Sequence, residues 1–591
     1  MTPADGVRAY HALSCHRPEC FAPGPGQLDW ATQPAPFRRY AGARLVELLH
    51  RPQEESPGYD EVFVGPIGQP TPLSLHSVSQ LLYDSLALSA WKEAGGNRWA
   101  LRVNPSSGNL HPTEAYLLLP AGAVDNAALL AHYSADEHGL EVCAELAVPL
   151  ADQLNDVLPT GGFLLALASI PWREAWKYGE RAYRYCNHDL GHALACLGIA
   201  AAIQGWEVRL LRGVAEARLD AVFGLDREGF NERECVDVLL WIGPPQAAEF
   251  PLPDTLLKGL AELPLSGAPN RLSRDYRHWP ELERVHGLCR APVLPAAASW
   301  APAFAGVTRG ESPHLREVES STSAPVSGEG PDRHSRDRGT AASSRNSAGP
   351  KGDNPENSRT PEQPANPGLP LRPILHRRRS AQSMDGRSGI HAELLYAWLR
   401  RLMPEQSPVP FACTGEPARI DLLLFVHRVQ DLAPGLYWLG RSGRQPGGLR
   451  DDFQWQPVIE SGLPLYRLLQ GDARGLSAFL SCGQDIASDG CVAFAMLADL
   501  DAALTKGAWT YPRLYWECGQ IGQLLYLEAE AAGISGTGIG CYFDPMVEEL
   551  LGDGPDRPVS LYHFTIGRAV WDTRLTSLPA YPAPRRHPFE L

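Results

Sequence analysis

One helical pattern occurs twice in this 591-residue chain, and it restricts the possible folds more than any other feature. The first copy is HDLGHALACLGIAAAIQGWEV at 188–208, and the second is WECGQIGQLLYLEAEAAGISG at 516–536. Three glycine pairs share one offset of 328 positions: Gly191 and Gly519, Gly205 and Gly533, and Gly224 and Gly552. This shared register predicts two copies of one domain that pack together as an intramolecular pseudo-dimer.

The pattern of apolar residues predicts a mixed fold of helices and strands. Both repeated segments are apolar on nearly every face, which is typical of helices buried against each other. Apolar runs predict buried strands at 114–120, 162–170, 236–243 and 561–567. Helical spacing predicts helices over 74–92 and 392–403. The expected fold class is α+β, with two similar layers of helices around mainly antiparallel sheets.

A change of composition divides the chain into two domains. Residues 320–368 are rich in Ser, Pro, Gly, Asn and charged residues, and they have no hydrophobic period. Such a segment buries too little apolar surface to offset the entropy of the chain. The predicted organisation is therefore an N-terminal arm over 1–60, a first domain over 61–290, a disordered linker over 291–370 and a second domain over 371–591.

Charge and hydropathy exclude several classes of partner. The net charge of −15 opposes broad electrostatic binding to nucleic acid or to an anionic membrane. The N-terminus lacks the pattern of a signal peptide, and the longest apolar runs are too short to cross a bilayer. The 12 cysteines are scattered, and no second Cys/His cluster accompanies Cys15, His16 and Cys20. We expect a cytoplasmic protein without a metal site.

The densest polar motif is RVNPSSGNLHPTEAYLLL at 102–119. It places hydroxyl and amide groups between two apolar segments, and its glycine lets the backbone approach a flat ligand closely. A well-hydrogen-bonded loop without a ligand is the structural alternative. The candidate ligand residues of this motif are Arg102, Ser106, Ser107, Gly108 and Asn109.

A second motif, AWKYGERAYRYCNHDLGH at 175–192, sets cations among tyrosines directly before a buried helix. Lys177 and Arg184 are costly to bury without a partner, so they imply either an anionic ligand or a salt-bridge network. The second copy of the repeat has Gly507 in place of Tyr178. We therefore expect the two copies to be functionally unequal.

A third motif, HRRRSAQSMDG at 376–386, stands at the entry to the second domain. Guanidinium groups pair with phosphate oxygens, and a helix beginning at Ser380 would add backbone donors. A basic run that lies in water is the alternative. The motif is therefore a candidate phosphate site.

A fourth motif, GISGTGIGCYFDPMVEELLG at 533–552, contains closely spaced glycines. They follow a helix rather than a strand, which does not fit a dinucleotide-binding motif. We predict a tight loop at Gly538 and Gly540 that brings the backbone close to a ligand.

Together the motifs resemble those of the nitroreductase-like FMN-dependent oxidoreductases, most of all the SagB-type dehydrogenases. The matching segments are PSSGNLHPTEAY (105–116), WKYGERAYRYCNHDLGH (176–192), RRSAQ (378–382), GTGIGCYFD (536–544) and WDTRLTSLPAY (571–581). The resemblance implies two fused nitroreductase-like α/β/α domains with FMN at their interface. It also implies hydride transfer through flavin N5, with NAD(P)H or the substrate itself as the donor.

The resemblance assigns roles to individual residues. Lys177 and Tyr178 match the pair assigned to catalysis, and a nearby lysine would let Tyr178 act as a general base. The cofactor-binding candidates are Arg102, Ser106, Ser107, Gly108, Asn109, Arg184, Arg378, Arg379, Ser380, Gly538, Gly540 and Arg574. The second domain lacks the Ser/Asn loop and the first lacks a clear RRS motif. One FMN site built from both domains is therefore expected rather than two.

Two other functions stay open at this point. One is azoline dehydrogenation in thiazole/oxazole peptide biosynthesis, together with a cyclodehydratase. The other is a pseudo-dimer scaffold that has lost FMN, which the altered loop at 410–425 favours and the intact Ser/Asn loop opposes. The expected substrate is a small molecule or a peptide.

Overall fold

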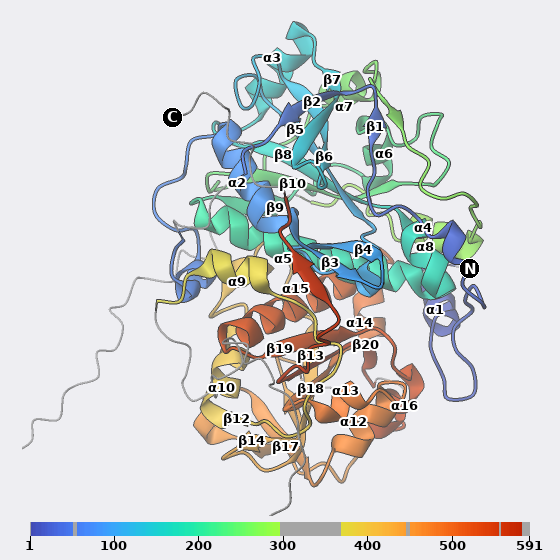
Figure 1. The fold of residues 1–591 in the computed structure, drawn as a ribbon, viewed down its shortest axis with the longest axis vertical. Coiled ribbons are helices and arrows are strands. Elements are labelled where there is room, and N and C mark those ends of the chain that lie inside the picture. Colours follow the sequence, from blue (N-terminus) through green and yellow to red (C-terminus); the bar gives the residue numbers. More distant parts are fainter. Residues whose placement is uncertain (1, 51–55, 296–367, 445–448, 555–556, 582–591) are drawn as a thin grey trace, which may run out of the picture. The chain divides into compact units, whose positions relative to one another are not determined.

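Two seven-stranded sheets of equivalent topology, one in each half of the chain, form the framework of the computed structural model (Figure 1). The structure describes residues 2–50, 56–295, 368–444, 449–554 and 557–581. We call 2–295 the first half and 368–581 the second half. Most of the linker predicted over 291–370 lies outside the described residues.

The first sheet has the strand order β2-β7-β6-β5-β8-β10-β9, and all neighbouring strands are antiparallel. Its strands are β2 (Arg44–Glu47), β5 (Thr113–Leu119), β6 (Leu129–Ser134), β7 (Gly139–Glu145), β8 (Phe163–Ser169), β9 (Glu207–Leu210) and β10 (Cys235–Gly243). The central strand β8 is buried at every residue, because its Phe, Leu and Ala side chains leave no polar face. The strands predicted in this half are therefore confirmed.

The second sheet has the corresponding order β16-β17-β15-β13-β18-β20-β19, again antiparallel throughout. Its strands are β13 (Ile420–Val426), β15 (Gly435–Leu439), β16 (Gln456–Pro457), β17 (Leu465–Gln470), β18 (Val492–Ala498), β19 (Ser535–Ile539) and β20 (Val559–Gly567). Strand β20 confirms the strand predicted at 561–567. The matching orders of the two sheets show that the halves are copies of one architecture.

The two repeated segments form the long helices α5 (Ala182–Ile203) and α15 (Thr510–Ala531), which lie between the two sheets in Figure 1. The two helices cross where Gly191 of α5 lies against Gly519 of α15. A Cβ atom on Gly191 would lie 2.2 Å from the Trp516 carbonyl oxygen, and one on Gly519 would lie 2.3 Å from the His188 carbonyl oxygen. The crossing therefore requires glycine on both helices, and the predicted pseudo-dimer is confirmed.

Shorter helices cover the sheets and the ends of the long helices. Those of the first half are α1 (Pro3–Leu13), α2 (Leu75–Ser85), α3 (Val148–Val157), α4 (Pro171–Tyr178), α6 (Leu219–Val222), α7 (Asp254–Ala261) and α8 (Pro280–Leu288). Those of the second half are α9 (Leu371–Arg377), α10 (Ala392–Arg401), α11 (Pro408–Phe411), α12 (Arg474–Leu480), α13 (Asp485–Asp489), α14 (Leu500–Leu504) and α16 (Asp544–Leu551). Helix α10 confirms the helix predicted over 392–403.

Each half sends a terminal segment onto the other. His16, which follows α1, pairs with Phe543 of the second half. In the opposite direction, β21 (Thr576–Leu578) adds to the hairpin of β3 (Leu88–Ala94) and β4 (Asn97–Arg102). These exchanged segments and the crossing helices join the two halves into one compact unit.

Three local predictions were wrong. The helix predicted over 74–92 ends at Ser85, because the residues from Leu88 onward pair with β4 and β21 instead. The loop expected around Gly538 is strand β19, which pairs with β20. Ser380 does not begin a helix; it follows the end of α9 and pairs with Gly536. In all three cases a partner distant in sequence determines the local structure.

None of the helices within the described ranges combines the length and the apolar character needed to span a membrane.

Candidate functional site

A cavity of about 490 Å³ lies where the two halves meet, and we call it the seam cavity. Its volume falls within the roughly 300–1,000 Å³ typical of small-molecule sites. The predicted site residues that line it are Arg102, Ser106, Ser107, Gly108, Asn109, Tyr178, Arg378, Arg379, Ser380, Gly538 and Gly540. The structure thus brings the first and third motifs, one from each half, around one space.

The loop between β4 and β5 is held in shape by its own polar side chains. Asp189 of α5 accepts hydrogen bonds from the Ser107 backbone N–H and the Ser107 hydroxyl, each at 2.9 Å. Asn109 donates from Nδ2 to the Ala100 carbonyl at 2.9 Å. The backbone is left-handed at Gly108 (φ 59°) and at Asn109 (φ 60°). The loop is therefore well hydrogen-bonded internally and also forms one wall of the seam cavity.

Arg378 and Arg379 present two adjacent guanidinium groups to the seam cavity, the first buried and the second partly buried. Among the described residues neither has a carboxylate within ion-pair distance, and the hydrogen bonds of both go to backbone carbonyls. Burial lowers the pKa of both groups, and repulsion from Arg378 helps to bring that of Arg379 to about 10. Since buried like charges without a counterion are costly, an anion bound here would relieve their repulsion.

Lys92 adds a third cation to the same wall, and none of the four sequence motifs contains this residue. It belongs to β3, and its Nζ donates to the Ser577 hydroxyl of the arm from the second half. Burial and the nearby charge of Arg379 lower the pKa of the Lys92 ammonium. Among the described residues that line the cavity, Asp189 is the one acidic side chain. The cavity wall is therefore strongly cationic.

Tyr526 of α15 connects the arginine segment to β19. Its hydroxyl lies 2.8 Å from Ser380 Oγ and accepts a hydrogen bond from the Gly538 N–H at 2.9 Å. A Cβ atom on Gly540 would lie 2.1 Å from Tyr185 Cε1, so a larger residue there would displace that ring. The glycines of the fourth motif thus allow tyrosine side chains to pack against the backbone beside the cavity.

Lys177 and Tyr178 end α4 beside the 104–109 loop. A Cβ atom on Gly108 would lie 2.5 Å from Tyr178 Oη and 3.2 Å from Lys177 Nζ, so both side chains approach the loop. Burial and the neighbouring Glu174 carboxylate raise the pKa of the Tyr178 hydroxyl well above its usual value. Tyr178 therefore keeps its proton and can donate a hydrogen bond. This contradicts the expectation that Lys177 makes it a general base.

Asp189 gives the site a measurable pH dependence. Burial raises the pKa of its carboxyl to about 7 from an ordinary 3.8, although hydrogen bonds from the loop serines oppose the shift. Because the folded state keeps this proton between those values, folding loses about 1.4 kcal/mol per pH unit as pH rises through that window. We expect Asp189→Asn to remove this loss, measured as urea unfolding free energies between pH 4 and 7. An unchanged slope would contradict the prediction, and Asp152→Asn at an exposed position is the control.

Comparison with known proteins supports the fold. No family model matches the sequence, and no curated protein matches it. Among solved structures, the chain is similar to a putative nitroreductase from Anabaena variabilis, with a TM-score of 0.62 and 21% identity over 96% of this chain and 99% of that chain. The chain therefore has the nitroreductase fold.

Two further solved structures match part of the chain. A putative nitroreductase from Ralstonia eutropha has a TM-score of 0.26 and 17% identity over 36% of this chain and 89% of that chain. The E. coli microcin synthetase McbBCD complex with truncated pro-MccB17 bound has a TM-score of 0.24 and 17% identity over 41% of this chain and 93% of that chain. At these TM-scores neither match supports a conclusion.

Two predicted cofactor ligands, Arg184 and Arg574, are not among the residues that line the seam cavity. Arg184 is buried on α5, where its Nη1 forms an ion pair with Asp544 Oδ1 at 2.5 Å. Its charge is therefore already neutralised, and the salt-bridge alternative applies to it. The side chain of Arg574 is 85% exposed and pairs with Asp572. Neither arginine lines the cavity, although Trp571 and Leu575 on either side of Arg574 do, so the structure does not place these two predicted ligands among the others.

The internal repeat gives the seam a second, pseudo-symmetric position, and that position is closed. Gly198 stands at the repeat offset from Tyr526, and a Cβ atom on it would lie 3.4 Å from Pro410 Cβ. The space left beside them is about 20 Å³, which is room for about one water molecule. A flavin does not fit there. The expectation of a single site agrees with this difference between the two positions.

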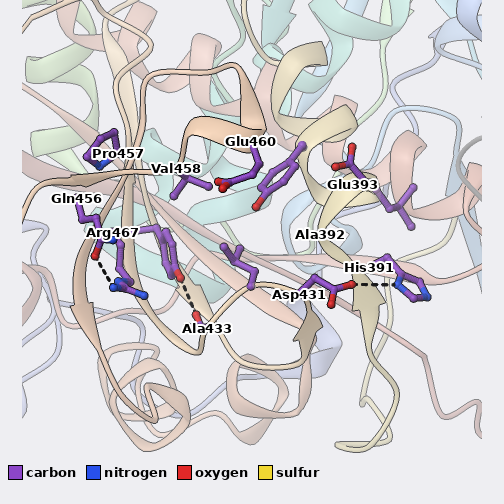
Figure 2. A pocket seen from close by; sticks show the side chains of 14 residues that line it. His391, Ala392, Glu393, Asp431, Ala433, Gln456, Pro457, Val458, Glu460 and Arg467 are labelled. Carbon is purple, nitrogen blue, oxygen red and sulfur yellow. Dashed lines mark hydrogen bonds and ion pairs between the residues drawn. The ribbon is translucent and has the colours of Figure 1, made fainter.

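A larger cavity, of about 690 Å³, lies within the second half alone (Figure 2). Its acidic side chains, Glu393, Asp431 and Glu460, are exposed at the surface. Its cation Arg467 donates to Gln456 on the neighbouring strand, as Figure 2 shows. This groove has no pair of adjacent cations among its lining residues, so we place the candidate site in the seam cavity.

Proposed function

We propose that the protein is an FMN-dependent oxidoreductase whose single cofactor site is the seam cavity. The observation that carries the proposal is the pair of adjacent guanidinium groups of Arg378, which is buried, and Arg379, which is partly buried; both lack a carboxylate partner among the described residues. Cations of this kind match the phosphate of a mononucleotide. The Nε atoms of Arg102 and Arg378 are also buried without a hydrogen-bond partner, which leaves further donors for a ligand.

The residues present fit FMN in position and in charge. Arg378, Arg379 and Lys92 would hold the phosphate, and the backbone of the 104–109 loop would lie along the flat ring. FMN supplies a two-electron carrier when it is bound, and the protein supplies binding, orientation and electrostatics. Positive charge in the cavity also favours the anionic form of a reduced ring.

Lys177 and Tyr178 are the proposed catalytic residues. The Tyr178 hydroxyl, which stays protonated, would donate a hydrogen bond or a proton to the substrate, and Lys177 would stabilise the negative charge that results. NAD(P)H is the proposed electron donor. Membership of the SagB-type branch, with a peptide substrate, remains a prediction from the sequence motifs.

The test of this proposal is binding of FMN to the purified full-length chain. We expect FMN fluorescence to be quenched on binding, with saturation at a single equivalent, and the bound flavin to be reduced by NADH or NADPH. Tyr178→Phe should bind FMN as tightly as the wild type but turn over more slowly. A chain that leaves FMN fluorescence unchanged would overturn the proposal and favour the scaffold alternative.

A further inference from the structure

Two cysteines face each other beside the seam cavity. Cys541, which follows β19, lines the cavity, and its Sγ lies 2.7 Å from the Sγ of Cys482 in the turn after α12. Both are partly exposed, whereas nine of the other cysteines are buried and Cys20 is fully exposed. The two thiols are therefore in direct contact, and Cys541 is accessible from the cavity; contact is what a dithiol needs in order to form a disulfide.

The surroundings of this pair favour sulfur chemistry. The hydrogen bond from Cys482 lowers the pKa of the Cys541 thiol to about 5, and His16 and Arg181 add to the shift against the effect of burial. The thiolate is the reactive form of cysteine. Gln484, another residue of the cavity wall, donates to the Cys541 carbonyl at 3.1 Å and fixes the backbone there.

The backbone at Cys482 is unusual for a residue with a side chain. Its φ of 56° is left-handed, and Gly483 continues the turn with a φ of 72°. Such a conformation costs a non-glycine residue free energy and is concentrated at functional sites. The conformation directs the Cys482 side chain to Cys541, so the turn maintains the contact between the two thiols.

We propose that Cys482 and Cys541 form a reversible dithiol–disulfide pair that exchanges two electrons with FMN in the seam cavity. On oxidation the Cys541 thiolate and the Cys482 thiol form one S–S bond as the Cys482 S–H bond breaks. The two electrons and the proton from Cys482 would pass to oxidised FMN, which gives the singly protonated, anionic reduced form. The proposal rests on the proposed function, because FMN is the oxidant; in the reverse direction reduced FMN regenerates the dithiol.

The first test does not depend on the cofactor. Flavin-free protein is equilibrated in mixtures of reduced and oxidised dithiothreitol, free thiols are alkylated, and peptides are analysed by mass spectrometry. We expect Cys482 and Cys541 to lose alkylation together and to appear as a cross-linked peptide pair, while Cys20 remains alkylated. In Cys482→Ser or Cys541→Ser the remaining partner should stay alkylated. Alkylation of both cysteines to the level of Cys20 in the most oxidising mixture would overturn the proposal.

The second test measures electron exchange. Prereduced protein is mixed anaerobically with FMN, and binding is followed by fluorescence while reduction is followed by loss of flavin absorbance. We expect one flavin to be bleached for each disulfide formed, and no bleaching with Cys482→Ser or Cys482→Ala. Bound FMN that stays oxidised beside the dithiol would refute the proposed electron exchange alone. Failure of FMN to bind would refute the proposed function.

Discussion

Replacing Asp544 with alanine is expected to destabilise the folded protein by about 3–5 kcal/mol, because it leaves two buried guanidinium groups without a counterion. Asp544 begins α16, and its carboxylate accepts hydrogen bonds from Arg181 at 3.0 Å and from Arg184 at 2.5 Å. All three side chains are at most 1% exposed. Burial opposes ionisation of Asp544, but the two arginines hold its pKa below the usual range.

Loss of the Asp544 carboxylate should also weaken the attachment of the N-terminal segment to the second half. The same carboxylate accepts the backbone N–H of His16 at 2.9 Å. Urea unfolding of Asp544→Ala and Asp544→Asn measures the effect, and Asp472→Ala serves as the control because that residue pairs with Arg474 on the surface. The asparagine variant keeps the shape but not the charge, so it should lose most of the same free energy. A midpoint equal to that of the control would show that Arg181 and Arg184 do not need this partner.

Replacing Arg378 and Arg379 together with alanine is expected to abolish tight binding of FMN. A hydrogen bond to a charged group contributes about 1.5–3 kcal/mol, and about 1.4 kcal/mol corresponds to a tenfold change in Kd. Each single variant should therefore bind FMN roughly 10- to 100-fold more weakly, and the double variant more weakly still. Fluorescence titration measures the affinities.

The stability of the flavin-free protein should change in the opposite direction. Repulsion between the two adjacent guanidinium groups is removed in the double variant, so its melting temperature without FMN should equal or exceed that of the wild type. Arg377→Ala is the matched control, since this neighbour is 63% exposed and pairs with Glu530. Wild-type FMN affinity in the double variant would exclude these arginines as the phosphate site.

The long-range architecture was predictable because it depends on residues that tolerate no substitute. Gly191 and Gly519 meet backbone at the crossing of α5 and α15, and that requirement is visible as a repeated spacing in the sequence. Buried strands such as β8 were predictable because they are apolar at every position. The hairpin at Lys92 was missed because the helical spacing of 74–92 outweighed the turn signal of Gly95-Gly96, and because its other partner β21 lies in the other half of the chain.

The candidate site was predictable in composition but not in the role of each residue. Motifs from both halves converge on the seam cavity, yet Ser107 and Asn109 use their side chains to shape the loop. Arg184 carried the same signal as Arg378, a cation beside a buried helix. Only the fold shows that Asp544 neutralises the first and that the second has no carboxylate partner among the described residues.

Pro410 against Gly198 gives the chain a freedom that two identical subunits do not have. In a homodimer every substitution appears on both sides of the axis, whereas a fused chain changes one side at a time. Here one end of the axis is closely packed, whereas the seam cavity stays open at the other. A substitution at the closed end therefore leaves the residues that line the seam cavity unchanged, so each end of the axis can vary by itself.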